Sequence, residues 1–194
     1  TAVFPIYFES ITSQKQGSIS FFGFDFEPTA LYSYSLSFSF FLVAFMSPIL
    51  SGIADYTGSK KKFMQFFCYL GGISVMMLFF FDSIDTVWIG LIFSILASIG
   101  FWSSIVFYNS FLPEVAYPEQ QDAASAKGFM FGYIGSLFLL GFNLFMIMSP
   151  DTFGIESSTL PSRISFLMVG LWWIGFAQVT FAKLPDNVHH RKPK

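Results

Sequence analysis

Five long stretches without a charged residue follow one another along this chain, at roughly residues 30–52, 63–81, 86–109, 128–149 and 164–182. Each has about twenty residues, which is the length an α-helix needs to cross the roughly 30 Å hydrocarbon core of a bilayer. In lipid every backbone polar group must be satisfied internally, which a helix achieves within one segment. The pattern predicts an all-α fold class: a polytopic transmembrane helix bundle with five complete spans.

The first eight residues are also apolar, but they are too few for a sixth complete span. As a helix they would be about 12 Å long, less than half the hydrocarbon core. We expect them to be the outer end of a first helix that begins upstream.

Within residues 31–40, serine alternates with a large tyrosine, leucine or phenylalanine side chain. This period of two residues is also typical of a strand in a membrane barrel. Barrel strands would have to recur along the chain, and this stretch stands alone. On a helix, Ser33 and Ser37 share one face, while Ser35 and Ser39 lie nearly opposite. Such serines either face a wet cavity or bond the carbonyls of their own helix, and the sequence leaves both readings open.

A lysine-rich turn separates the first two spans. Its residues Lys60, Lys61 and Lys62 predict a cytoplasmic position, because short cytoplasmic loops are enriched in Lys and Arg. When alternate loops are assigned to the inside, eight of the ten basic residues fall there, and only Lys15 and Arg163 fall outside. The chain is therefore expected to be an integral, multi-pass membrane protein.

Composition agrees with a lipid environment and excludes several function classes. Mean hydropathy is +0.61, and 11% of residues are charged, far below the quarter found in soluble domains. A net charge of −2 offers no basic surface for nucleic acid. The single cysteine, Cys68, has no partner for an internal disulfide, and two histidines, His189 and His190, make no zinc site, so we expect neither metal nor cofactor.

Small residues and proline mark the ends and faces of two spans. Gly128, Gly132 and Gly135 let helix backbones approach closely, either as static packing or as a gating contact. Pro113 cannot donate a backbone hydrogen bond, so a helix is expected to break near it. The polar residues 117–127 that follow are expected to form a linker or an interfacial helix.

Polar side chains within the spans are candidates for lining a cavity. The candidates are Ser33, Ser37, Asn109, Asn143 and Gln178, each of which needs a hydrogen-bond partner in hydrocarbon or contact with water. Bonds between helices are the alternative. No acidic or basic residue lies in the middle of a complete span, so a proton-coupling group would have to lie at a span end, as Glu9 and Glu114 do, or outside this chain.

At the lysine turn the sequence resembles a known family. Residues 51–62 are similar to the signature loop between the second and third helices of the major facilitator superfamily, whose pattern runs G-x-x-x-D-[RK]-x-G-[RK]-[RK]. Asp55, Gly58 and Lys60 keep this pattern, and Lys61 extends its basic end. The pattern is broken at three positions, namely Ser51, Tyr56 and Ser59.

Further segments resemble the branch of that superfamily that contains the autophagy-related vacuolar amino-acid effluxers and their bacterial relatives. They are residues 2–7, 47–50 with 54–55, 108–113 and 132–135. The resemblance implies that residues 1–184 are the N-terminal six-helix half of a twelve-helix carrier, with helix one truncated. Residues 185–194 would then begin the central cytoplasmic loop.

This resemblance implies a secondary transporter that moves a small organic solute, amino acids among the candidates, by alternating access. Its partners would be the lipid bilayer, the missing C-terminal six-helix half and the solute. The loop with Asp55, Gly58, Lys60 and Lys61 would latch one side, with Asp55 against a helix N-terminus of the other half. The membrane would be the plasma membrane, or the vacuolar one in a eukaryote. The leading alternative is a non-transporting membrane scaffold; an enzyme and a channel fit less well.

Overall fold

The computed structural model describes residues 3–13, 19–21 and 24–184. In this part of the chain, five helices are long and apolar enough to cross a membrane, which confirms the predicted fold class. They are α2 (Pro28–Thr57), α3 (Lys60–Met77), α4 (Val87–Ser110), α6 (Pro118–Met148) and α7 (Leu160–Lys183). The shorter elements are α1 (Val3–Thr12), β1 (Ile19–Phe21), β2 (Phe24–Phe26), η1 (Leu78–Phe80), η2 (Ile84–Thr86), α5 (Leu112–Val115) and η3 (Pro150–Phe153).

The stretch in which serine alternates with large side chains is helical and not a strand. Residues 31–40 lie within helix α2. The Ser33 and Ser37 hydroxyl groups donate to the carbonyls of Thr29 and Ser33, each over 2.8 Å. These hydroxyls are therefore satisfied by their own helix, as serine allows in an apolar setting.

Two features differ from the sequence-based expectations. The polar residues 117–127 are not a separate linker, because helix α6 begins at Pro118 and runs unbroken into the span. Pro118 at the first helical position and Glu119 in the first turn both favour a helix start there. The antiparallel hairpin of β1 and β2 was also not predicted, since its three-residue strands are too short to show a period.

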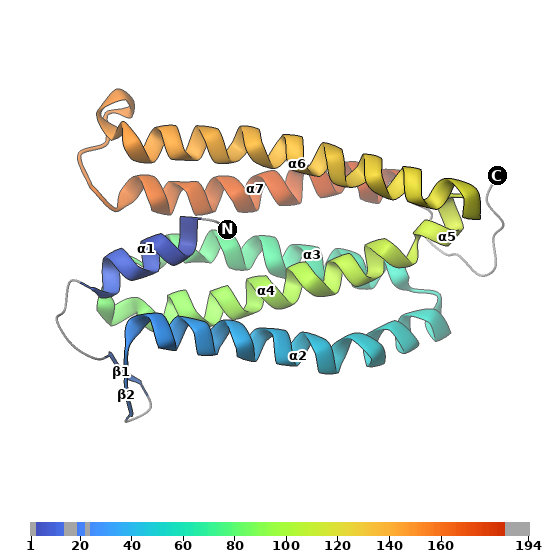
Figure 1. The fold of residues 1–194 in the computed structure, drawn as a ribbon, viewed down its shortest axis with the longest axis horizontal. Coiled ribbons are helices and arrows are strands. Elements are labelled where there is room, and N and C mark those ends of the chain that lie inside the picture. The colour runs from blue at the N-terminus through green and yellow to red at the C-terminus, as the bar shows by residue number, and fades with distance from the viewer. Residues whose placement is uncertain (1–2, 14–18, 22–23, 185–194) are drawn as a thin grey trace.

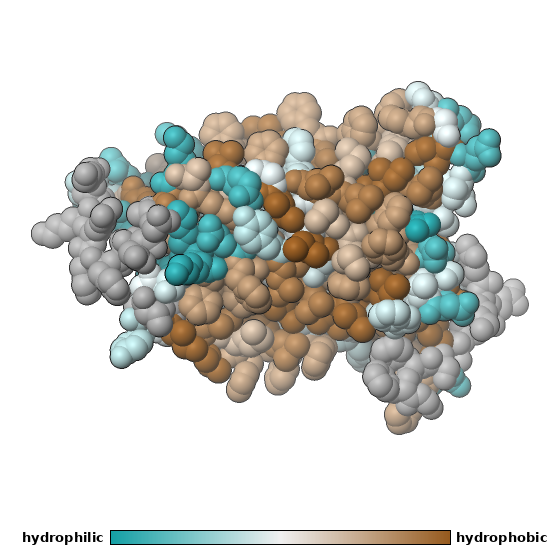
Figure 2. Space-filling view, turned by 180° about the vertical axis from the view of Figure 1, so that it is seen from behind, coloured by the Kyte–Doolittle hydropathy of each residue, from teal (hydrophilic) through white to brown (hydrophobic). Residues whose placement is uncertain are grey.

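The long helices run side by side along one direction, and loops gather at the two ends of the bundle (Figure 1). We call the end that carries residues 60–62 the lysine end, where α2, α4 and α7 finish and α6 starts. Apolar residues cover the middle of the surface, and hydrophilic residues lie mainly towards the ends (Figure 2). This banding fits a protein that crosses a bilayer. Which side of the membrane the lysine end faces stays a prediction.

Helix α3 lies at the centre of the bundle and packs against both α4 and α7 at glycines. A methyl group at Gly100 of α4 would lie 2.5 Å from the Cα atom of Gly71. One at Gly170 of α7 would lie 2.6 Å from the carbonyl oxygen of Gly72. The backbones are so close that a side chain at either contact would collide with main chain, which is the packing mode that small residues permit between membrane helices.

An aromatic cluster joins α1 to the bundle. The rings of Phe4, Phe8 and Tyr7 each lie within 6.3 Å of the Phe81 ring, centroid to centroid, and the Tyr7 hydroxyl donates to the Phe81 carbonyl over 2.7 Å. Phe166 of α7 completes the cluster and is fully buried. Edge and tilted ring contacts of this kind add about 0.5–1.5 kcal/mol beyond area burial. They fix α1 between η1 and α7.

Arg163 ties the start of α7 to the end of α3, at the end opposite the lysines. Its Nε donates to the carbonyl of Phe79 over 2.6 Å, and its guanidinium lies 4.7 Å from the centre of the Phe79 ring. A carboxylate oxygen of Asp82 lies 3.7 Å from its Nη1. The arginine that the charge pattern placed outside thus holds two helix ends together.

The glycine contact gives a direct stability prediction. Gly100→Ala in the full-length protein should lower the free energy of unfolding by about 1–3 kcal/mol, because the methyl group meets backbone atoms that cannot rotate away. The measurement is the midpoint of thermal unfolding in detergent. Gly141→Ala is the matched control, since a methyl there meets no described atom within 4 Å. Equal midpoints for the two variants would contradict the close contact.

Candidate functional site

The loop between α2 and α3 is a sharp reversal built on one glycine. Helix α2 ends at Thr57, Gly58 follows with φ of 64°, and α3 starts at Lys60. A positive φ at the residue after a helix is the common glycine stop signal, and other residues adopt it at a cost. Gly58 therefore sets the tight turn that brings the lysines beside the end of α2.

Asp55 lies in the last turn of α2, three residues before Gly58. Its backbone is described, whereas its side chain lies outside the described part of the structure. The C-terminal end of a helix carries a partial negative charge, so an acid there is not stabilised by its own helix. An external positive end or cation would be a favourable partner for it.

The lysines at the start of α3 are also not stabilised by their own helix, because cations are unfavourable at a helix N-terminus. The structure gives two of them partners on other helices. The Lys60 Nζ lies 3.1 Å from the Glu114 Oε1, and the Lys61 Nζ donates to the carbonyl of Leu184 over 2.8 Å. Leu184 is the C-cap of α7, so Lys61 binds the negative end of that helix. These bonds join the start of α3 to α5 and α7.

The Lys60–Glu114 pair is largely shielded from solvent. The side chains are 19% and 15% exposed, and the second Glu114 oxygen is buried without a hydrogen-bond partner among the described residues. Glu114 is held there by α5, which follows the end of α4 at Ser110 and contains Pro113. The predicted helix break near Pro113 is confirmed, and it turns the chain so that the carboxylate reaches the lysine.

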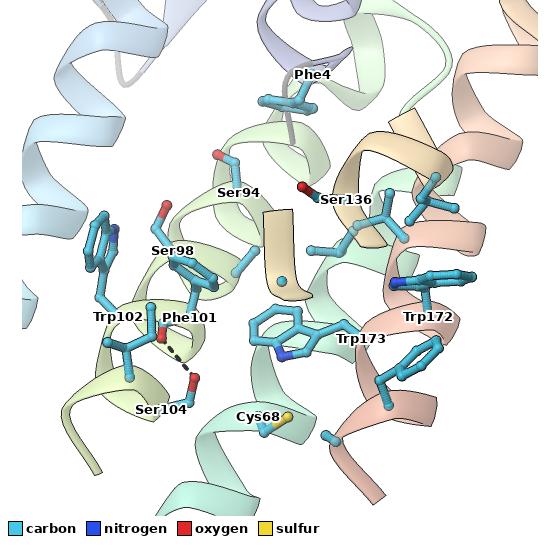
Figure 3. Close-up of a pocket in the computed structure, with 18 of the residues that line it drawn as sticks. Phe4, Cys68, Ser94, Ser98, Phe101, Trp102, Ser104, Ser136, Trp172 and Trp173 are labelled. Atoms are coloured by element: carbon cyan, nitrogen blue, oxygen red, sulfur yellow. Dashed lines mark hydrogen bonds between the residues drawn. The ribbon is translucent and has the colours of Figure 1, made fainter. Parts of the chain in front are cut away.

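A large, partly open cavity lies between the helices of the bundle. It measures about 910 Å³ and is lined by residues of α1, α2, α3, α4, α6 and α7, together with Leu78 of η1. Aromatic rings form much of its wall, among them Phe4, Phe101, Trp102, Trp172 and Trp173, and small polar side chains such as Ser94, Ser98 and Ser136 lie between them (Figure 3). Its described lining includes no charged side chain. The cavity therefore offers apolar and aromatic contact rather than ion pairing.

Asn143, like Ser136, is a polar side chain of α6 that lines this cavity, and its role there stays a prediction. It is 1% exposed, and its Oδ1 has no hydrogen-bond partner among the described residues. The other candidates for cavity lining lie elsewhere. Ser33, Ser37, Asn109 and Gln178 are exposed, and the Gln178 Oε1 accepts from the Tyr69 hydroxyl over 3.1 Å. The predicted cavity-lining role of these four residues stays a prediction.

Among the described residues, a methyl group at a glycine of α6 would meet no backbone atom of another helix within 4 Å. Gly132 lines the cavity, and a methyl there would meet no described atom within 4 Å. A methyl at Gly128 would lie 3.1 Å from the Tyr108 hydroxyl, and one at Gly135 would lie 3.8 Å from the Trp172 ring. Their role in helix packing or gating stays a prediction.

Sequence reasoning missed the residues that hold the bundle together. Gly71, Gly72, Gly100 and Gly170 make the close contacts, although each lies in the middle of a predicted span, where glycine is unfavourable unless packing requires it. Their position in the middle of an apolar span was the signal by which the sequence could have identified them as packing residues. In the described part of the chain, no three His, Cys, Asp or Glu side chains are placed to hold a metal ion.

Comparison with known proteins gives consistent relatives over nearly the whole chain. Residues 10–194 match the family described as "Vacuole effluxer Atg22 like". The "Uncharacterized MFS-type transporter YxiO" of Bacillus subtilis is 34% identical over 193 residues, which cover 98% of this chain and 42% of that protein. "Autophagy-related protein 22-2" of Aspergillus niger is 23% identical over 91% of this chain and 39% of its own length.

This chain thus spans about two-fifths of the length of these relatives. No solved structure matches it. The family match covers most of the chain, the fold is a bundle of membrane-length helices, and the loop after α2 keeps Asp55, Gly58 and Lys60 of the signature. This chain is therefore a multi-pass membrane protein that belongs to the Atg22-like family.

Proposed function

We propose that this chain is the N-terminal half of a secondary transporter that moves a small organic solute across a membrane by alternating access. The geometry of the loop between α2 and α3 carries the proposal. Lys60 and Lys61 bind other helix ends of this same bundle, so the start of α3 moves with it as one body. Rigid halves that rock against each other around a midplane site are the way such transporters work.

Asp55 is proposed to latch this half to a C-terminal half. The negative end of α2 gives the carboxylate no stabilisation, whereas a helix N-terminus from the other half would stabilise it by about 0.3–2 kcal/mol. A contact of that strength, present in one conformation only, biases a two-state equilibrium by up to about thirtyfold. This is sufficient to favour closure at the lysine end without locking it.

The faces that would meet the other half are proposed to lie on α2 and α6. In the most apolar window of each helix, 6% of α2 and 17% of α6 is buried inside the structure, against 44% of α3. Low burial supports a face left for lipid or a partner. Large exposed rings such as Phe41 and Phe45 of α2, at 68% each, supply contact area for either.

The solute is proposed to be a small organic molecule, with amino acids as the first class to test. The support is the description of the family as vacuole effluxers and the name of the bacterial relative as a transporter. The full-length protein, reconstituted in liposomes, should accumulate radiolabelled solute from an amino-acid pool above the level of empty liposomes. If no solute class is moved by correctly inserted protein, the scaffold reading replaces this one.

A single change tests the latch. In the full-length protein, Asp55→Ala should lower the initial transport rate several-fold, up to about thirtyfold, because the closed state loses its helix-end contact. Insertion and surface amount should stay unchanged in a membrane fraction blot. Asp122→Ala, at an exposed acid in the first turns of α6, is the control and should transport normally. Unchanged flux for the Asp55 variant would argue against the latch.

A charge exchange tests the rigid joint. Lys60→Glu and Glu114→Lys should each reduce transport, since each places like charges about 3 Å apart at a shielded position. The double exchange should restore much of the rate and the thermal midpoint, with a coupling of about 1 kcal/mol or more. Lys62→Glu, at an exposed side chain, serves as the control. Additive losses in the double variant would show that the pair does not act as a joint.

A further inference from the structure

Two exposed lysines lie on either side of the bond that joins α3 to α7. The Lys61 Nζ donates to the carbonyl of Leu184 over 2.8 Å. Lys62 directly follows Lys61, and Lys183 directly precedes Leu184, so this bond brings the two lysines near each other. Neither Lys62 nor Lys183 has an ion-pair partner among the described residues, and α3 and α7 contain no acidic residue. The junction therefore concentrates positive charge at one end of the apolar band.

The exposed face of α3 continues from Lys62 as an apolar stripe. Phe66 and Ile73 are 60% and 50% exposed. They follow Lys62 at a spacing of four and then seven residues, which puts all three on one side of the helix. This face has a cation at its end and apolar side chains along the span. A phospholipid with an anionic headgroup has the complementary shape, since its charge is at one end and its acyl chains extend from it.

A polar pair lies on the same outer surface. Tyr69, three residues after Phe66, donates its hydroxyl to the Gln178 Oε1 over 3.1 Å. The Gln178 Nε2 donates to the carbonyl of Ile174 over 2.9 Å, and its second hydrogen has no partner among the described residues. Gln178 precedes Leu184 by six residues, about 9 Å of helix. The headgroup layer is about 5–8 Å thick on each side of a bilayer, so this amide lies near the depth at which lipid ester carbonyls can accept its hydrogen.

A second copy of the chain suits this surface less well than a lipid does. The commonest dimers have a two-fold axis, which sets the same patch of each copy against the other. In a membrane that axis runs along the bilayer normal, so Lys62 and Lys183 would face the same lysines of the other copy. Like charges placed opposite each other disfavour such a contact. A lipid phosphate would instead neutralise them, and basic groups between membrane helices attract anionic headgroups in this way.

We propose that the outer seam between α3 and α7, at the lysine end, binds one anionic phospholipid. Its phosphate contacts Lys62 and Lys183, and an ester carbonyl accepts from the Gln178 Nε2. An acyl chain lies along Phe66 and Ile73. The lipid thereby joins the start of α3 to the end of α7. This site goes beyond the proposed transport function and does not depend on which solute is moved.

The test compares two lipids with the same acyl chains, added to the full-length protein in detergent. Dioleoyl phosphatidylglycerol should raise the thermal midpoint by several degrees more than dioleoyl phosphatidylcholine, whose headgroup has no net charge. Native mass spectrometry, which does not depend on unfolding, should find one phosphatidylglycerol retained on each chain. Inorganic phosphate at the same concentration should leave the midpoint unchanged, because it has no acyl chain to lie along α3.

Variants of the exposed side chains locate the site. Lys62→Gln combined with Lys183→Gln should abolish the difference between the two lipids, and Gln178→Leu should lower the amount of phosphatidylglycerol retained. Without added lipid, the double variant should unfold at the wild-type midpoint, because neither lysine has an ion-pair partner among the described residues. Lys127→Gln, at an exposed lysine of α6, is the matched control and should keep the full difference between the lipids.

Three results would overturn the proposal. The first is an equal shift of the midpoint by both lipids, which would show that the seam does not select an anionic headgroup. The second is the same loss of effect in Lys127→Gln as in the double variant, which would show diffuse attraction to the whole surface. The third is a dimer that Gln178→Leu separates, which would assign the seam to a second copy. Each of these results leaves the proposed transport function untouched, because none of them measures solute movement.

Discussion

The contact of α3 with α4 and α7 at glycine is the constraint on which the rest of the bundle depends. In lipid, apolar side chains gain little by leaving one hydrocarbon environment for another, so helices associate through close packing and polar contacts. Gly71 and Gly72 let the α3 backbone approach Gly100 on one side and Gly170 on the other. This central contact joins α3 to both α4 and α7.

The ends of the bundle are fixed by charges that oppose or satisfy helix dipoles. At the lysine end, Lys61 binds the C-terminal carbonyl of α7 and Lys60 binds Glu114 after α4. At the other end, Arg163 binds the carbonyl of Phe79 where α3 gives way to η1. Cations placed at carbonyl ends are favourable on electrostatic grounds, and here they also connect elements distant in sequence. The bundle is therefore tied at its centre and at both ends.

This rigidity shapes how the function is understood. The proposed transporter half, moving as one body, would need its conformational contacts at its edge, and Asp55 lies in the last turn of α2. The partly open cavity has aromatic walls, and one of its lining side chains, Asn143, has a buried amide oxygen without a hydrogen-bond partner among the described residues.

The sequence by itself determined the class of fold and most of the span boundaries, because a run of about twenty uncharged residues has one stable arrangement in a bilayer. It also predicted a turn between the first two spans, because charged residues separate two apolar runs, and the break near Pro113, since proline acts on the local backbone. It did not show that residues 117–127 continue into α6, because their polar composition fits several structures.

Only the tertiary structure decided which side chains meet. Glu114 and Lys60 are 54 residues apart, and Lys61 and Leu184 are 123 apart, so no local pattern could pair them. The same holds for the four packing glycines and for the place of Asn143 in the cavity wall. Apolar spans constrain helix rotation weakly, because lipid accepts nearly any apolar face. The choice of inward face is therefore made by contacts between helices.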